Sequence, residues 1–172
     1  MPICNNIDSD YTRSCGNVSS GIKEIYLTNY SAGTTWAKTG AGQVTGGTGV
    51  PTSYQYEIRQ KNSSATEEGI INDQFGSINI NQNLTIVLLG YGDQTVRQAA
   101  NNLLGSQMVA LIKTEDDKWL LFGEGSPLEV SATNGASGVQ AGEFAGINLT
   151  ISAQASDYAP TISTAYAATL TA

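Results

Sequence analysis

One segment of the chain, residues 78–88, alternates between apolar and polar residues and constrains the fold more than any other. The even positions carry the apolar residues Ile78, Ile80, Leu84, Ile86 and Leu88. Successive side chains of a β-strand point to opposite faces, so this period of two predicts a long strand with one dry face and one wet face. Gln82 interrupts the apolar series.

Shorter segments of β-branched, aromatic and alternating residues predict further strands. They lie at residues 21–30, 54–58, 108–113, 119–122, 128–133 and 147–153. Residues 31–53 are rich in Gly, Thr and Ser and are expected to form a loop, and Asn134-Gly135 is expected to form a turn. Residues 60–76 are mostly polar. We therefore expect the 54–58 and 78–88 strands to pair as one long hairpin with an extended tip.

A helix is predicted at about residues 93–104. Asp93 is suited to cap its N-terminus, and Gly105 stands where a helix ends in a left-handed residue. Apolar residues recur between them at helical spacing, namely Val96, Ala99, Ala100, Leu103 and Leu104. The helix should therefore pack one face on a sheet.

These elements predict a mainly β fold, a two-sheet sandwich or barrel-like domain with one flanking helix and a long β-hairpin. The chain length of 172 residues suits one domain. We divide it into an N-terminal extension at residues 1–20, a single β domain at 21–159 and a C-terminal arm at 160–172. The Ala/Thr-rich arm is expected to become ordered only on contact with a neighbour.

Composition argues against catalysis and against tight binding of nucleic acid. The chain has no His, which removes the commonest general base and metal ligand. Fifteen acidic residues outnumber eight basic ones, for a net charge of −7, whereas proteins that grip DNA neutralise phosphates with Lys and Arg. We predict no catalytic residue, no cofactor and no metal site. The acidic clusters at 8–10 and 115–117 are interpreted as turns, Glu67-Glu68 as part of a solvated loop, and the Gly-rich residues 40–49 as a flexible loop.

Two features bear on cellular location. The first residues lack the basic and apolar stretches of a signal peptide, and no apolar run is long enough to span a membrane. We therefore expect synthesis and assembly in the cytosol. Cys4 and Cys15 are expected to be reduced thiols there, although a disulfide closing a small loop is the alternative.

Several segments together resemble a group of structural proteins from tailed bacteriophages that infect Bacteroidetes. The similar segments are residues 21–27 (GIKEIYL), 54–58 (YQYEI), 84–88 (LTIVL), 119–124 (WLLFGE) and 146–150 (GINLT), with Ala159-Pro160. The order of elements is also similar to the fold shared by phage tail-tube proteins and the tube of type VI secretion systems. This resemblance implies two packed sheets, a flanking helix, a long hairpin that reaches the next ring, and hexameric rings stacked into a tube.

The resemblance implies a structural virion protein of the tail, assembled in the host cytoplasm. Its partners would be copies of itself, neighbouring tail or connector proteins, and double-stranded DNA that passes without specific binding. The residues expected at contacts between subunits or rings are Trp36, Arg59, Lys61, Glu67, Glu68, Asp73 and Phe75; no channel-lining residue is assigned. Two alternatives stay open. One is a connector, terminator or capsid-decorating phage protein, and the other is a secreted carbohydrate-binding β-sandwich in which Trp36 and nearby Tyr residues form the binding platform.

Overall fold

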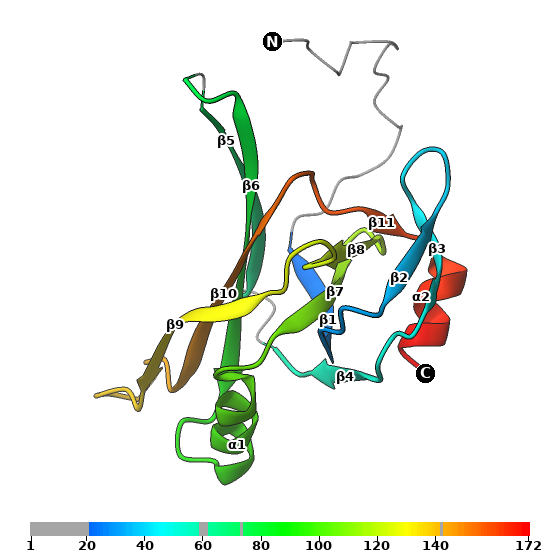
Figure 1. The fold of residues 1–172 in the computed structure, drawn as a ribbon. Helices are drawn as coiled ribbons and strands as arrows, with labels where there is room; N and C mark the ends of the chain where they lie inside the picture. Colours follow the sequence, from blue (N-terminus) through cyan, green and yellow to red (C-terminus); the bar gives the residue numbers. More distant parts are fainter. Residues whose placement is uncertain (1–20, 59–61, 73, 142) are drawn as a thin grey trace.

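The computed structural model describes residues 21–172 except 59–61, 73 and 142. Within these residues the chain is mainly β and forms two sheets flanked by two helices (Figure 1). The predicted mainly β, two-sheet architecture is confirmed at this level. The described strands form two open sheets rather than one closed barrel.

Sheet A contains seven strands in the order β2-β3-β11-β8-β7-β1-β4. Its strands are β1 (Ile22–Asn29), β2 (Thr35–Lys38), β3 (Val44–Thr48), β4 (Ser53–Tyr56), β7 (Met108–Thr114), β8 (Trp119–Phe122) and β11 (Thr161–Ile162). All neighbours are antiparallel except the pair β3 and β11. Strands β2 and β4 are the two edges of the sheet.

Sheet B contains four strands in the order β5-β6-β10-β9, and each neighbouring pair is antiparallel. Its strands are β5 (Ser64–Asn72), β6 (Ser77–Leu89), β9 (Glu129–Ala136) and β10 (Gly146–Ala155). The long strand predicted at residues 78–88 is β6. Its far end and β5 extend together beyond the body of the molecule as a projecting hairpin (Figure 1).

The main hydrophobic core lies between the two sheets. Sheet B contributes the dry side of β6 and β10, including Leu84, Ile86 and Leu149, and sheet A contributes Ile25 and Ile112. A second cluster lies on the other side of sheet A, where Val109, Leu111 and Leu121 alternate with residues of the first core. Sheet A is therefore apolar on both faces, whereas sheet B is apolar on one.

Helix α1 (Gln94–Leu103) confirms the predicted helix and its ends. The Asp93 side chain accepts a hydrogen bond from the Thr95 backbone N–H at 2.9 Å, and Gly105 has a left-handed φ of +76°. Ala100 and Leu103 are buried against the sheets. The N-terminal cap and the glycine stop act as the sequence predicted. The apolar stripe is confirmed except at Leu104, which caps the C-terminus and is 45% exposed.

The C-terminal segment differs from the expected arm, because the structure packs it onto the chain itself. Residues 161–162 form β11 inside sheet A, and a second helix, α2 (Thr164–Leu170), follows. Ile162 and Ala167 are buried in the second cluster, and Ser163 caps the helix. The apolar outer face of sheet A requires such a cover.

The predicted hairpin has the right strand but the wrong partner. Strand β6 pairs with β5, in the segment expected to be a polar tip, with Ala65 opposite Leu84 and Ile71 opposite Ile78. Strand β4 instead pairs with β1 in sheet A, with Tyr54 opposite Leu27. The prediction was wrong because β5 is mostly polar. An edge strand that extends beyond the core needs few apolar residues, so its composition resembles that of a loop.

Two further predictions are wrong for local reasons. The 31–53 segment contains the β2–β3 hairpin instead of a loop throughout. Asn134-Gly135 lies inside β9 instead of forming a turn. Glycine is required there because a Cβ at Gly135 would lie 2.9 Å from the Tyr91 ring. Its role is close packing rather than chain reversal.

Candidate assembly surface

The projecting hairpin presents a group of exposed apolar side chains that we call the hairpin tip. It comprises Ile70, Ile71, Phe75 and Ile78, which are 48%, 69%, 77% and 59% exposed. Ile78 belongs to the predicted dry face of β6. Unlike Ile80, which is buried by the rest of the molecule, Ile78 lies on the projecting part of the strand and is exposed. An exposed apolar group of this kind on a projecting element is typical of an interaction site.

The Asn72 side chain bonds to the backbone of two described residues near the end of the hairpin. The Asn72 side-chain oxygen accepts hydrogen bonds from the backbone N–H groups of Gln74 and Phe75, at 3.1 and 3.3 Å. Gly76 has a φ of +59°, a left-handed value that suits glycine. The Asn72 bonds link the backbone of Gln74 and Phe75 to the end of β5.

The face of sheet B opposite the core is polar, and we call it the polar face. The register places the following residues on it: Thr66, Glu68, Asn81, Asn83, Thr85, Asn134, Asn148, Thr150, Ser152 and Gln154. They are partly or fully exposed. The register also places two apolar residues on this face, the exposed Ile70 and the buried Val87. None of the four strands contains Lys or Arg, and the charged residues that the register places on this face are acidic, Glu68 and Glu129.

The two edges of sheet B are long and run in opposite directions. β5 has nine residues and β9 has eight, whereas β2 and β4, the edges of sheet A, have four each. Because each step across sheet B is antiparallel, β5 and β9 are antiparallel to each other. The edge of one copy therefore matches the opposite edge of another for continued antiparallel pairing.

A buried polar link joins the hairpin to the rest of the molecule. Gln82 is only 3% exposed; its oxygen accepts from the Gly123 backbone N–H at 3.0 Å, and its amide nitrogen donates to Glu67 at 3.3 Å. Glu67 also accepts from the Ala159 backbone N–H at 2.6 Å. Glu67 and Glu68 thus lie in β5 rather than in a solvated loop. The link connects β5, β6, the end of β8 and the segment before β11, which explains the polar interruption in the apolar series.

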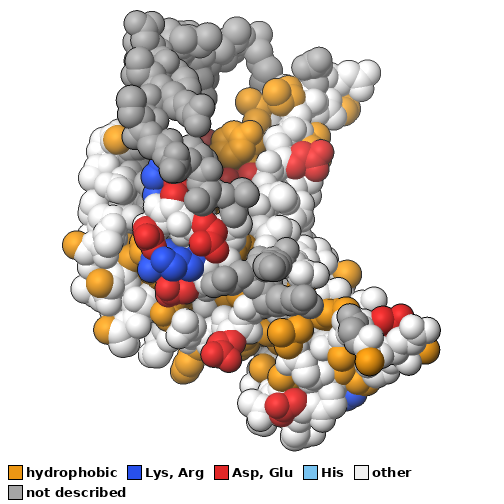
Figure 2. Space-filling model, turned by 180° about the vertical axis from the view of Figure 1, so that it is seen from behind, with side chains coloured by type: hydrophobic (Ala, Val, Ile, Leu, Met, Phe, Trp, Pro, Cys, Tyr) orange, Lys and Arg blue, Asp and Glu red, His pale blue; other side chains and the backbone are white. Residues whose placement is uncertain are grey.

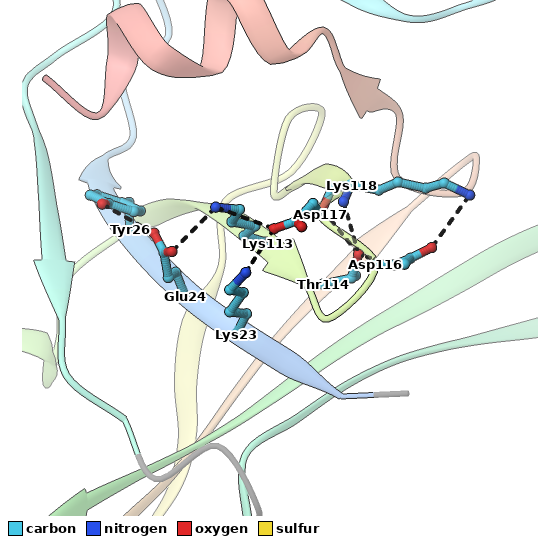
Figure 3. Close-up of polar contacts among 8 residues, drawn as sticks. All are labelled: Lys23, Glu24, Tyr26, Lys113, Thr114, Asp116, Asp117 and Lys118. Carbon is cyan, nitrogen blue, oxygen red and sulfur yellow. Dashed lines mark hydrogen bonds and ion pairs between the residues drawn. The ribbon is translucent and has the colours of Figure 1, made fainter. Parts of the chain in front are cut away.

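A network of charged residues lies where β1 meets the β7–β8 turn (Figure 3). Lys23 Nζ lies 2.9 Å from Asp117 Oδ1, and Lys113 Nζ lies 3.3 Å from Glu24 Oε1 and 3.5 Å from Asp117 Oδ1. Lys118 pairs with Asp116 at 3.4 Å. As predicted, residues 115–117 form a turn.

The network also lowers the pKa of two of its carboxyl groups. The hydrogen bond from Lys23 and the charge of that lysine lower the pKa of Asp117, and the hydrogen bond from Thr114 lowers the pKa of Asp116. Outside the network, Lys38 pairs with Glu124 at 2.6 Å, so each of the four lysines in the described part of the chain is ion-paired. The arrangement leaves these lysines poorly suited to hold phosphates.

A groove opens between the two sheets beside helix α1, and we call it the α1 groove. It has a volume of about 1070 Å³. Its walls include Tyr54 and Ile58 from β4 and the residues after it, Leu89 from the end of β6, and Val96 and Ala99 from α1. Figure 2 shows hydrophobic side chains beside a hollow at this end of the molecule. Polar and charged side chains also line the groove, among them Lys23 and Glu24 of the charged network. The groove was not predicted from the sequence, because its walls come from separate segments.

The structure brings together some of the predicted contact residues. Glu67, Glu68 and Phe75 all lie on the β5–β6 hairpin. Trp36 lies far from them on β2 and packs, partly buried, against the second hydrophobic cluster. The remaining candidates, and both cysteines, lie outside the described residues: Arg59, Lys61, Asp73, Cys4 and Cys15.

The sequence analysis missed Ile70 and Ile71 as contact candidates. Two adjacent isoleucines in an otherwise polar stretch were the available signal.

Three further findings concern the described residues as a set. They contain no group of three or more His, Cys, Asp or Glu side chains arranged to hold a metal ion. Neither α1 nor α2, the helices of the described chain, is long and apolar enough to cross a membrane. Comparisons with protein-family models, with curated proteins and with solved structures found no match to the chain.

Proposed function

We propose that this chain is a non-enzymatic structural subunit that assembles with copies of itself into the tail tube of a bacteriophage. The observation that carries the proposal is the construction of sheet B. It is a four-stranded sheet with one face on the core, one polar face and two long antiparallel edges. Unpaired strand edges promote aggregation of a free monomer, whereas in a polymer each edge can pair with a neighbouring copy.

Assembly into a ring follows from these edges. In this proposal β5 of each subunit pairs with β9 of the next, so every edge has a partner when the ring closes by rotation. The four strands of each copy then become part of one continuous antiparallel barrel, whose inner surface is the polar face. Sheet A, with its second cluster and α2, lies outside and supports it.

The chemistry of the polar face suits a channel for DNA. Asn, Thr, Ser and Gln side chains present neutral polar groups, and Glu68 and Glu129 add negative charge. A wall without Lys or Arg has no group that neutralises phosphates, so DNA slides past without being held. Neighbouring tail or connector proteins would close the two ends of the tube, and assembly would take place in the host cytoplasm.

Electron microscopy of the purified chain tests this proposal. Negative-stain images should show rings and hollow tubes at high protein concentration, and light scattering should give a mass that is a multiple of the subunit mass. Rings that never stack would favour a connector or terminator ring instead. A protein that stays monomeric, with neither rings nor tubes, would end the proposal.

A further inference from the structure

We propose that the α1 groove binds a neutral oligosaccharide, with the Tyr54 ring as a stacking platform and the side-chain amides around it as hydrogen-bonding partners. The inference goes beyond the proposed function and does not depend on it, because ring closure uses β5 and β9, whereas the groove is walled by β4, α1 and the end of β6. Four observations carry it: the tyrosines at the edge of sheet A, the amides near them, the charge of the groove and its size.

Two tyrosines of β4 form one side of the groove. Tyr54 lies opposite Leu27 of β1, and Tyr56 lies opposite Ile25. Cross-strand partners share a face of the sheet, and both β1 residues belong to the main core, so the two tyrosines lie on the core-facing side of sheet A. Tyr54 is nevertheless 58% exposed, because β4 is an edge strand and the groove opens beside it. An aromatic ring held in this way offers a flat apolar surface to a ligand.

Uncharged polar side chains line the groove near the tyrosines. Thr95, Gln98 and Asn102 are spaced three and four residues apart, so they form one stripe along α1, and all three line the groove. Gln55 of β4 lines it as well. Within the described residues, the side chains of Gln55, Gln98 and Asn102 make no hydrogen bond to the protein, and all three are exposed. Each amide therefore has donors and an acceptor available for a ligand.

This combination of apolar and hydrogen-bonding surfaces fits a sugar. A pyranose ring has an apolar C–H face that packs on an aromatic ring, and hydroxyl groups at its rim that both donate and accept hydrogen bonds. An entirely apolar ligand would leave the amides without partners, which costs binding free energy.

The charges in the groove favour a neutral ligand. Lys23 and Glu24 line the groove but are ion-paired in the charged network, with Asp117 and Lys113 respectively. Glu57 is exposed and adds a negative charge. The groove therefore disfavours phosphates, nucleotides and acidic sugars, because juxtaposed like charges oppose binding.

The size of the groove and the length of β4 narrow the ligand further. A volume of about 1070 Å³ is at the upper end for small-molecule sites, which gives room for several linked sugars. An extended peptide that added a strand beside β4 would gain few backbone hydrogen bonds, because β4 has only four residues. An oligosaccharide needs no such edge.

The proposed site is distinct from the platform expected at Trp36. The Trp36 side chain packs, partly buried, against the second cluster and does not line the groove. Its ring is therefore less available for stacking than the ring of Tyr54.

Binding of the purified full-length chain to an array of neutral glycans tests the inference. The array carries oligosaccharides of glucose, mannose, galactose, xylose and the N-acetylated hexosamines. We expect a defined subset of them to bind, and the affinity for the tightest of these is then measured by isothermal titration calorimetry. Tyr54→Ala should weaken that binding at least about tenfold, whereas Tyr54→Phe, which keeps the ring, should stay within about threefold of the wild type.

Matched variants separate a lost contact from a general loss of structure. Tyr158→Ala removes a tyrosine that is 63% exposed outside the groove, and it should leave binding unchanged. Gln98→Ala and Asn102→Ala, at exposed positions of α1, should each weaken binding about threefold to tenfold. Circular dichroism checks that each variant is folded.

A wild-type chain that binds no neutral glycan on the array would overturn the inference, and so would equal affinities of the wild type and Tyr54→Ala. Tighter binding of heparin, a polyanion, would also contradict it. Rings without glycan binding would overturn this inference alone. Glycan binding without rings would support it while contradicting the proposed function.

Discussion

Sheets A and B share a core but differ in how completely the chain itself satisfies them. Sheet A has a core on one face and the second cluster under α2 on the other, and its edges are short. Sheet B has the core on one face, the polar face on the other, and edges of nine and eight residues. Within the described residues, the chain covers both faces of sheet A but leaves one face and two long edges of sheet B uncovered.

If the proposed assembly is right, this difference separates the residues that stabilise the fold from the residues that contact other copies. Substitutions on the dry side of β6, or under α2, should reduce stability. Substitutions on the polar face, the edges of sheet B and the hairpin tip should leave stability unchanged and alter association. The following predictions test the separation, beginning with the largest expected effect.

Two adjacent residues of β6 give the sharpest contrast between the faces. Ile86 is fully buried, and its replacement in Ile86→Ala removes three carbons from the core, which should lower the free energy of unfolding by about 4 kcal/mol. Thr85 lies on the polar face, and Thr85→Ala should change it by less than about 0.5 kcal/mol. Urea unfolding of the dilute chain measures both. Equal losses would mean that the polar face is also covered in the free subunit.

The polar link tests whether the hairpin depends on both sheets. Gln82→Leu leaves the buried Gly123 N–H without its acceptor and should cost about 2–3 kcal/mol. The matched control is Asn83→Leu on the polar face. Combining Gln82→Leu with Glu67→Ala in a double-mutant cycle should give a coupling energy above about 0.5 kcal/mol. Additive losses would show that the two side chains act separately.

The packing of α2 against sheet A can be tested by substitution at one glycine. A Cβ at Gly47 would lie 2.5 Å from the Tyr166 hydroxyl of α2 and 2.9 Å from Val50. Gly47→Ala should therefore cost about 1–3 kcal/mol, and Tyr166→Phe should restore part of the loss. Gly46→Ala is the control, because the new methyl group would meet only Ala37 at an ordinary 3.6 Å. Thermal denaturation monitored by circular dichroism is sufficient, and equal effects at both glycines would contradict a packed α2.

The smallest expected effect is a pH dependence from the charged network. The folded state lowers the pKa of Asp116 and Asp117 below their ordinary value of 3.8. Their stabilising contribution is therefore present above pH 3.8 and disappears as the pH falls through the lower, folded-state pKa values. Asp117→Asn should lower the Tm slightly at pH 6, and the difference from wild type should shrink below pH 3.8. Because these side chains are exposed, the change should be small. A difference that grows in acid would contradict the assignment.

Local signals in the sequence were sufficient to predict much of the fold. The alternation at 78–88 identified β6, and Asp93 with Gly105 marked both ends of α1. These signals depend on neighbouring residues, which periodicity and capping report directly.

Pairing between distant segments could not be predicted in the same way. The sequence does not specify whether β4 or β5 lies beside β6, because that choice depends on which strand the core covers. For the same reason the polar character of β5 was mistaken for a loop. The candidate site was predicted in part, because Phe75 was named as a contact residue. The groove at the other end of β6 was not predicted, because its walls come from β4, β6 and α1, and no local sequence pattern shows that these segments lie together.

The most direct test of the central claim is cross-linking between the edges of sheet B. In a chain with Cys4→Ser and Cys15→Ser, Thr66→Cys on β5 and Ala132→Cys on β9 lie at least about 14 Å apart, because three strand spacings separate β5 from β9. That distance is too long for a disulfide within one copy. Oxidation should give a ladder of covalent oligomers on a denaturing gel. The control pair, Thr35→Cys on β2 and Gln55→Cys on β4, should give monomers. A ladder from the control and monomers from the sheet B pair would contradict edge-to-edge assembly through β5 and β9.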